Sequence, residues 1–313
     1  MKKNEFKHIP VMLNEVLDGL NIKKDGIYVD CTIGGGGHSE QILKRLSPNG
    51  HLYGFDRDLD AIETCKERLK DYKNLTLLHA NYKDAKELLN NLGVTQVDGI
   101  LIDLGVSSYQ IDTGERGFSF LHDGELDMRM DRSQEKSAYQ VVNTYSKERL
   151  IDILYRYGEE SNAKRIVENI IKHRQEKPIE TTFELKEIIE QSFPKKILYG
   201  KGGVSKQTFQ AIRIEVNGEL EGLDKTLEGF IDLLSSNGRM AVITFHSLED
   251  RIVKNVFKLE STDCICPPKI PVCICGHKAE IKLVNKKPIT ASPKELEMNN
   301  RSRSAKLRIV EKI

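Results

Sequence analysis

Two aspartates and the run of glycines between them are the residues of this chain best suited to bind a ligand. Four consecutive glycines, Gly34 to Gly37, follow Asp30 and precede Asp56. Glycine has no side chain, so the backbone of such a loop can approach a bound molecule closely. Asp56 lies 20 residues after Gly36, a spacing at which a carboxylate can accept hydrogen bonds from both hydroxyl groups of a ribose. The spacing therefore indicates a site for an adenosine-containing cofactor.

The residues around the glycines favour one class of cofactor. A dinucleotide-binding loop has a third glycine that permits close packing over a pyrophosphate, and here Ser39 stands at that position. The loop contains no Arg or Lys to neutralise phosphate, whereas Asp30 precedes it and would attract positive charge. These features favour S-adenosylmethionine, which carries a sulfonium and an ammonium group. A nicotinamide dinucleotide and a purely structural turn stay open as alternatives.

Alternating strand and helix patterns surround this loop. Apolar runs typical of buried strands alternate with segments whose apolar residues recur at helical spacing. Such an alternation predicts a doubly wound α/β sheet. We expect its first strands at Ile27–Cys31, Leu52–Phe55, Leu75–His79 and Val97–Leu104.

The pattern changes in the middle of the chain. From about Gln110 to Ser205 only helical periods are found, and strand signals return near Met240. Two later runs are expected to form an antiparallel pair, at Ile281–Val284 and Ala305–Val310. The chain is therefore predicted to contain a discontinuous cofactor-binding domain and an inserted helical domain for substrate recognition, with the bounds 1–112 and 206–313 for the first and 113–205 for the second.

Composition is typical of an intracellular enzyme. Charged residues make up 30% of the 313 residues, and no apolar run approaches the roughly 18 residues of a membrane-spanning helix. The first residues, MKKNEFKHIP, lack the apolar core of a signal peptide, so we expect a cytoplasmic protein with no membrane contact. The net charge is only +1, but residues 278–313 hold ten Lys and Arg against four Glu. This bias favours an anionic partner or a solvated basic tail.

Four of the six cysteines are clustered. Cys264 and Cys266 form one pair, Cys273 and Cys275 form a second, and His277 follows. In a chain without an export signal, clustered thiols favour metal over disulfides. Four thiolates can bind zinc tetrahedrally, although two residues usually separate such paired cysteines. A zinc site and a reduced, exposed loop are both consistent with this spacing.

Several unrelated motifs occur in one order along almost the whole chain: HIPVMLNEVLDGL, DCTIGGGGHS, DGILIDLGVSS, ERGFSF, LDMRMD, RIEVNGELE and FHSLEDRIVK. Together they closely resemble the MraW/RsmH family of bacterial 16S rRNA (cytosine-N4)-methyltransferases. The resemblance implies a Rossmann-like sheet of about seven strands, interrupted after the fourth strand by a helical domain, with S-adenosylmethionine as cofactor. It also implies methylation of the N4 amine of a cytidine in the decoding region of 16S rRNA, within the small ribosomal subunit or its precursor.

The resemblance assigns roles to individual residues. Asp103, near the end of the fourth predicted strand, becomes the candidate catalytic residue as well as a cofactor contact. The full set of cofactor contacts that it implies is Gly36, Gly37, His38, Asp56, Tyr82, Asp103 and Gln110. The candidate contacts to rRNA are Arg116, Arg129, Arg213, His246 and Arg251.

One departure from related enzymes concerns the base. Many methyltransferases that act on exocyclic amines have an aromatic residue just after the fourth strand, whereas Leu104, Gly105 and Val106 stand here. Stacking on the base would then fall to a later aromatic residue, with Tyr109, Phe118 and Phe120 as candidates.

Two other functions are weighed against this one. A nicotinamide-dependent oxidoreductase is disfavoured by Ser39 at the third glycine position. A non-catalytic ribosome-assembly protein that keeps an inactive cofactor fold is disfavoured by the presence of Asp30, Asp56 and Asp103 together.

Overall fold

The structure is a computed structural model that describes residues 10–198, 203–267 and 272–313. Two compact units divide the chain. The sheet unit comprises Met1–Gly105 and Gly222–Ile313, and the helical unit comprises Val106–Glu221. Within the described ranges, no helix is both long and apolar enough to span a membrane.

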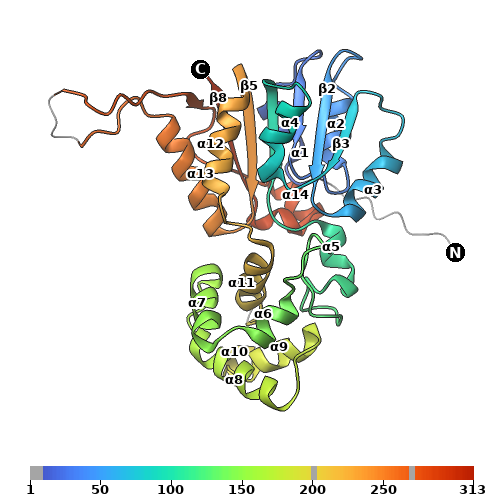
Figure 1. Ribbon diagram of the computed structural model, residues 1–313, viewed down its shortest axis with the longest axis vertical. Helices are drawn as coiled ribbons and strands as arrows, with labels where there is room; N and C mark the ends of the chain where they lie inside the picture. The colour runs from blue at the N-terminus through green and yellow to red at the C-terminus, as the bar shows by residue number, and fades with distance from the viewer. Residues whose placement is uncertain (1–9, 199–202, 268–271) are drawn as a thin grey trace. The chain divides into compact units, whose positions relative to one another are not determined.

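One eight-stranded sheet forms the centre of the sheet unit (Figure 1). The strand order is β3-β2-β1-β4-β5-β8-β6, and the two-residue β7 pairs with β8. β1 to β5 are parallel and β8 is antiparallel to β5, so the four early strands that the sequence predicts are confirmed. The bounds are β1 Ile27–Asp30, β2 His51–Asp56, β3 Leu75–His79, β4 Val97–Asp103, β5 Leu234–Thr244, β6 Ile281–Leu283, β7 Ile289–Thr290 and β8 Lys306–Lys312.

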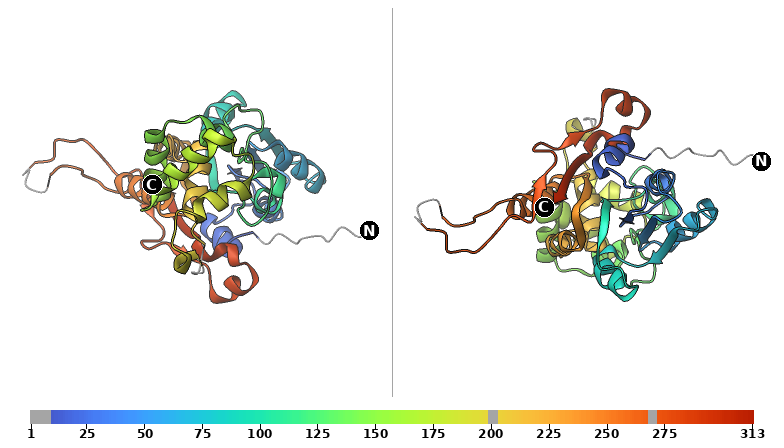
Figure 2. Two further views of the ribbon diagram at one scale, coloured as in Figure 1. Left: turned by 90° about the horizontal axis from the view of Figure 1, so that it is seen from below. Right: turned by 90° about the horizontal axis from the view of Figure 1, so that it is seen from above.

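Helices cover both faces of this sheet, as a doubly wound fold requires (Figure 2). Successive residues of a strand point to opposite faces, and β4 shows the consequence. Leu101 belongs to one apolar core, whereas Ile100 and Ile102 belong to another. The first core includes residues of α1 (Leu13–Leu20), α2 (Gly37–Leu43) and α3 (Leu59–Arg68), and the second includes residues of α4 (Ala85–Asn91), α12 (Leu223–Leu233) and α13 (Ser247–Glu260).

The basic C-terminal region folds into the sheet. β6 pairs antiparallel with β8, which confirms the predicted terminal pair. Lys306 and Arg308 of β8 both contact Asp250 of α13, at 3.1 and 2.8 Å. Lys306 and Arg308 are thus compensated inside the sheet unit. They are two of the ten basic residues of this region, which is folded and is not a solvated tail. Between these strands lie α14 (Pro293–Met298) and the 3₁₀ helix η3 (Asn300–Ser304).

The helical unit has its own apolar core, to which α6 to α9 and α11 contribute. Its helices follow from amphipathic segments with side-chain caps; Ser137 and Thr181 each form a reciprocal capping box with the residue three positions later. Among the described residues, the extended structure in this unit is one isolated bridge, Glu125 to Thr181. The bounds are α5 Ser108–Asp112, η2 Gly114–Arg116, α6 Ala138–Thr144, α7 Lys147–Gly158, α8 Ala163–Glu176, α9 Thr182–Glu190, α10 Lys195–Leu198 and α11 Lys206–Asn217.

The helical unit is longer than the predicted insertion at both ends. We expected it to span residues 113–205, but α11 belongs to it because Phe209, Ile212 and Val216 are buried in its core. α5 lies in the helical unit as well. The chain leaves the sheet unit at Gly105 and re-enters it at Gly222, two glycines with positive φ.

Candidate active site

Acidic side chains gather at the carboxyl edge of the sheet. Asp30, Asp56 and Asp103 are the last residues of β1, β2 and β4. Asp30 pairs in register with Gly54 and Leu101, each two residues before the end of its strand. In open parallel sheets the ligand crevice lies at this edge. The three aspartates are therefore placed where a ligand would bind.

Asp30 lies beneath the glycine loop. It is 1% exposed, and its two oxygens accept hydrogen bonds from the Ser39 hydroxyl at 2.6 Å and the Thr32 amide at 3.2 Å. Burial raises the pKa of Asp30 to about 6, against the lowering effect of these two hydrogen bonds. Asp30 thus holds the residues on both sides of the glycine loop, Thr32 and Ser39, and places a negative charge beneath the loop.

Asp56 fixes the glycine loop from the other side. Its Oδ2 accepts the Gly34 amide at 2.9 Å and its Oδ1 accepts the Asp58 amide at 2.9 Å. Burial raises the pKa of Asp56 to about 6, although both amides oppose that rise. A carboxylate has about four lone-pair positions, so Asp56 can hold the loop and still accept two ribose hydroxyl groups.

Two glycines of the loop are required by its geometry. Gly36 has a φ of +75° at the N-cap of α2, a conformation that other residues rarely adopt. A Cβ on Gly37 would lie 2.5 Å from Cγ of Pro10. The missing side chain of Gly37 therefore lets Pro10, just before α1, lie close to the start of α2.

His38 and Asp103 face each other across the site. His38 Nε2 lies 2.9 Å from the carbonyl oxygen of Val11, and a carbonyl can only accept, so Nε2 carries the proton. His38 Nδ1 is then directed toward Asp103, 3.8 Å from its Oδ2. The Asp103 amide donates to the Thr32 hydroxyl at 2.7 Å, which fixes the end of β4 next to the glycine loop.

Of the three aspartates, Asp103 has the environment that is least favourable for a negatively charged carboxylate. Its Oδ1 is buried and has no hydrogen-bond partner among the described residues. Burial is the main cause that raises the pKa of Asp103 well above its usual value, and the charges of Asp30 and Glu249 add to it. An unpaired, buried acceptor beside other acids is costly in the absence of a cation or a donor.

Glu249 is a fourth acid at this edge, and the sequence reasoning did not identify it. It is 1% exposed, and its Oε2 accepts the amides of Phe245 and His246 at 2.9 and 3.3 Å. His246, a predicted RNA contact, is the N-cap of α13 in a reciprocal capping box with Glu249. The segment FHSLED contains this signal, since a residue that can accept a hydrogen bond stands three positions before a glutamate.

The donor and acceptor chemistry of this edge fits S-adenosylmethionine. Acidic groups with raised pKa values favour a positively charged ligand, which would stabilise their ionised forms. The free acceptor Oδ1 of Asp103 and the remaining lone pairs of Asp56 suit ammonium and hydroxyl donors. A pyrophosphate would instead meet Asp30 and Asp103, so the site does not fit a dinucleotide.

The other predicted cofactor contacts are divided between the two units. Tyr82 begins the 3₁₀ helix η1 (Tyr82–Asp84) just after β3, at the same edge of the sheet, and packs partly buried against the apolar core on the α4 face. Gln110 belongs to the helical unit, where its side chain accepts the Ser107 amide at 3.0 Å in the capping box of α5. The structure therefore brings together His38, Asp56 and Asp103 but leaves Gln110 in a separate unit.

Three of the predicted RNA contacts are engaged within the helical unit. Arg116 is 2% exposed and donates to the carbonyl oxygens of Arg129 and Met130, at 3.0 and 3.2 Å. Arg129 contacts Asp127 and the Gln134 carbonyl. Arg213 forms a two-bond ion pair with Glu219, at 2.9 and 2.8 Å. These contacts favour structural roles for the three arginines, whereas Arg251 on α13 is exposed.

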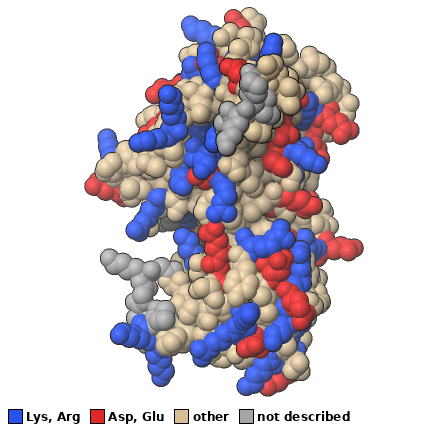
Figure 3. Space-filling view, turned by 90° about the vertical axis from the view of Figure 1, so that its left-hand side faces the viewer, with Lys and Arg blue, Asp and Glu red and all other residues tan. Residues whose placement is uncertain are grey.

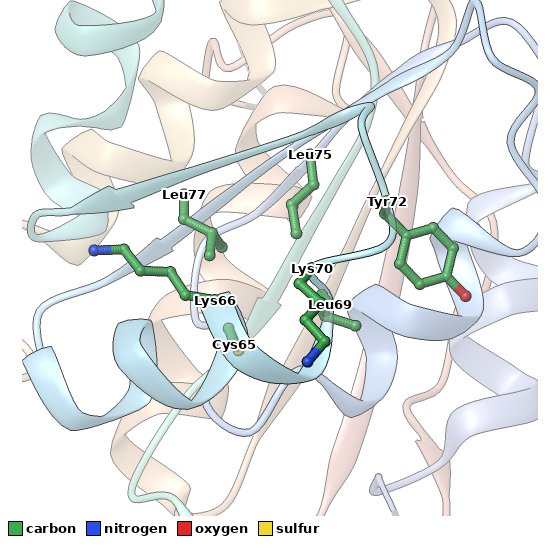
Figure 4. Close-up of a pocket in the computed structure, with 7 residues that line it drawn as sticks. All are labelled: Cys65, Lys66, Leu69, Lys70, Tyr72, Leu75 and Leu77. Atoms are coloured by element: carbon green, nitrogen blue, oxygen red, sulfur yellow. The ribbon is translucent and has the colours of Figure 1, made fainter.

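A surface hollow elsewhere in the sheet unit does not coincide with this edge (Figure 4). It has a volume of about 300 Å³ and lies between α3 and β3, where Leu69, Leu75 and Leu77 line it with two lysines. None of the acids at the carboxyl edge lines it. The candidate active site is therefore the acidic edge and not this hollow. The four clustered cysteines also lie elsewhere, between α13 and β6.

Comparison with known proteins gives matches over nearly the full chain. The profile of the MraW methylase family matches residues 5–313. A protein of Finegoldia magna named Ribosomal RNA small subunit methyltransferase H is 54% identical over 311 residues, which cover 99% of each chain. Proteins of the same name from Clostridium botulinum and Clostridioides difficile are 54% and 52% identical, over 99% of this chain and 100% of their own.

Proposed function

We propose that this chain, which belongs to the MraW methylase family, transfers a methyl group from S-adenosylmethionine to N4 of one cytidine in the decoding region of 16S rRNA. The observation that carries the proposal is the family match over residues 5–313. The acidic edge of the sheet supports it independently, because its chemistry suits a sulfonium cofactor. A nicotinamide-dependent activity finds no such support.

Cofactor binding is assigned to the acids and the glycine loop. Asp56 accepts the ribose hydroxyl groups, and Asp30 keeps the loop in shape through Ser39 and Thr32. His38 is held by Val11 so that its Nδ1 faces Asp103. When bound, S-adenosylmethionine supplies a methyl group on a sulfonium, which is already a strong donor.

The chain must supply orientation and a proton acceptor. Cytosine N4 is a poor nucleophile because its lone pair is delocalised into the ring. Asp103 Oδ1 is buried and has no hydrogen-bond partner in the described part of the chain. It can accept an N4 hydrogen and so let the nitrogen rehybridise, and the same carboxylate can later take the proton. Holding the amine in line with the methyl group provides much of the remaining acceleration.

The target base must leave any duplex before it reaches this edge. We assign recognition of the rRNA to the helical unit, together with the exposed Arg251. Of the three aromatic candidates for stacking, Phe118 is 9% exposed and Phe120 packs against Phe209 with ring centres 5.5 Å apart. Tyr109 is 56% exposed. Tyr109 is therefore the aromatic residue that we propose stacks on the base.

The substrate that we propose is the small ribosomal subunit or its precursor, which would be met in the cytoplasm. On the face drawn in Figure 3, Lys and Arg are interspersed with Asp and Glu, so the charge of this face alone does not indicate a path for RNA. A free RNA strand binds mainly through contacts between its phosphates and basic side chains. Because the charges on this face are mixed, we favour folded rRNA that presents an unpaired base as the substrate.

The proposal is tested by methyl transfer in vitro. Purified chain is incubated with radiolabelled S-adenosylmethionine and small subunits from a strain that lacks the enzyme, and the labelled nucleoside is identified. We expect N4-methylated cytidine from the wild type and a large loss of turnover for Asp103→Asn, with RNA binding retained because phosphate contacts set most of the RNA affinity. Label in ribosomal protein only would support a different substrate class.

A further inference from the structure

We propose that Cys264, Cys266, Cys273 and Cys275 bind one zinc ion as four thiolates. They lie in the loop between α13 and β6 of the sheet unit. The methyl transfer proposed here does not require a metal. The zinc site is therefore a separate property of the chain.

The sulfur positions match a tetrahedral site. Cys273 Sγ lies 3.5 Å from both Cys264 Sγ and Cys275 Sγ, and 4.0 Å from Cys266 Sγ. Cys264 and Cys275 are 3.8 Å apart, and all four sulfurs lie within 4.8 Å of one another. Zinc–sulfur bonds of about 2.3 Å in a tetrahedron separate the sulfurs by about 3.8 Å. The observed separations bracket that value.

Among the described residues, no apolar core gathers these four thiols. Each cysteine is exposed or only partly buried, and three apolar neighbours are exposed: Ile265 by 51%, Val272 by 71% and Ile274 by 77%. Figures 1 and 2 show the described residues on either side of 268–271 extending away from α13 as a long arm. Because burial cannot account for the convergence of four sulfurs in such an arm, coordination of a metal ion accounts for it best.

The base of the arm is fixed by hydrogen bonds. The Glu280 amide donates to the Glu260 carbonyl at 2.9 Å, which joins the end of α13 to the start of β6. His277 Nε2 lies 3.0 Å from the Leu259 carbonyl. The group of ligand atoms that lie within 4.8 Å of one another consists of the four cysteine sulfurs and does not include His277. The ligand set is therefore four sulfurs and not three sulfurs with a histidine.

Backbone amides surround the sulfurs. The Ile274 amide donates to Cys266 Sγ at 3.4 Å, and the amides of His277 and Ile265 hydrogen-bond Cys275. Such hydrogen bonds stabilise and orient thiolate ligands of a metal. Each thiol releases its proton to solvent when zinc binds, and no oxidant is needed. Four protein ligands leave no open position, so the zinc is structural.

Metal analysis of the full chain tests the site. We expect about one zinc per chain, and X-ray absorption should give sulfur neighbours at about 2.3 Å. The double variant Cys264→Ser/Cys275→Ser should lose the metal, whereas Ile274→Ser, from the same arm, and His277→Ala should keep it. Metal-free wild type that also fails to bind added zinc or cobalt after reduction would overturn the proposal, and so would iron in place of zinc.

Thiol titration and proteolysis separate the site from a disulfide-linked arm. Denatured, chelated wild type should give six reactive thiols, the full cysteine content; only Cys31 and Cys65 reacting would mean two disulfides and no zinc site. Removal of zinc should expose the arm to protease while binding of S-adenosylhomocysteine to the sheet unit is unchanged. An arm whose cleavage does not depend on zinc would contradict a structural role. None of these measurements depends on the rRNA assignment.

Discussion

At the level of single residues, the burial of several carboxyl groups at one edge of the sheet makes the site suited to a positive ligand. Asp30 and Asp56 have pKa values raised from 3.8 to about 6. The folded chain therefore binds more protons than the unfolded chain between these values, and these groups lower its stability as the pH rises from about 4 through 6. A bound cation would lower the pKa values of Asp30, Asp56 and Asp103 and so offset this loss of stability.

The first prediction concerns proton release. Binding of S-adenosylmethionine at pH 6 should release protons, because the sulfonium and ammonium groups favour ionised Asp30, Asp56 and Asp103. Calorimetry in buffers of different ionisation enthalpy measures the release directly. Affinity should also increase between pH 5 and 7. Asp103→Asn should release fewer protons than the wild type.

S-adenosylhomocysteine is the matched control ligand for this prediction, because it lacks the sulfonium charge. It should release fewer protons than S-adenosylmethionine. Equal release by the two ligands would show that the acids do not respond to the sulfonium.

The second prediction concerns Asp56 and the ribose. Asp56→Asn keeps one acceptor oxygen but loses the charge, and hydrogen bonds to a charged group contribute about 1.5–3 kcal/mol each. Cofactor affinity should fall at least tenfold. A 2′,3′-dideoxy analogue of S-adenosylhomocysteine lacks both ribose hydroxyl groups. The wild type should bind this analogue much more weakly than it binds the parent compound, whereas the variant should bind it only slightly more weakly than the parent compound. If the wild type and the variant lose equal affinity for the analogue, the ribose is held by another residue.

At the level of elements, the glycine loop and the segment before α1 support each other. A Cβ on Gly37 would overlap the ring of Pro10 at 2.5 Å, whereas a Cβ on Gly35 would meet nothing within 4 Å. The carbonyl that holds His38 belongs to Val11, the residue after Pro10. If Pro10 and Val11 are displaced, the His38 side chain should therefore move as well.

The third prediction follows from that contact. Gly37→Ala should lower the free energy of unfolding by about 1–3 kcal/mol, the usual effect of overpacking, and should weaken cofactor binding because His38 moves. Gly35→Ala is the control, and its unfolding free energy should change by no more than about 0.5 kcal/mol. Denaturant unfolding measures both. Equal stability of the two variants would show that Pro10 adapts without effect.

The sequence predicted the sheet well and the insertion only in part. Val97–Asp103 could be recognised as a strand because its apolar run is nearly continuous and ends at a carboxylate. The extent of the helical unit could not be recognised, because the period of α11 shows that one face is buried but not in which core. The burial of Arg116 was equally hidden, since its carbonyl partners come from Arg129 and Met130, more than ten residues away.

At the level of the whole molecule, two units with separate cores share one chain. The acids at the carboxyl edge belong to the sheet unit, whereas Tyr109 and Gln110 belong to the helical unit. We therefore expect cofactor binding and RNA recognition to be separable.

The fourth prediction tests this division. Replacement of Val106–Glu221 by a short glycine–serine linker between Gly105 and Gly222 should spare binding of S-adenosylhomocysteine and abolish methylation of rRNA. Circular dichroism and calorimetry confirm that the shortened chain is folded and binds the cofactor. Methylation at the wild-type rate would show that the helical unit is dispensable.

The central claim is most directly tested on rRNA from cells. Nucleosides of 16S rRNA are analysed by mass spectrometry from a strain that lacks this chain, and from the same strain supplied with the wild type or with Asp103→Asn. We predict that methylation at N4 of one cytidine is missing in the first strain, restored by the wild type and not restored by the variant. An unchanged nucleoside profile, or a missing methyl group on C5 or on a ribose, would contradict the account.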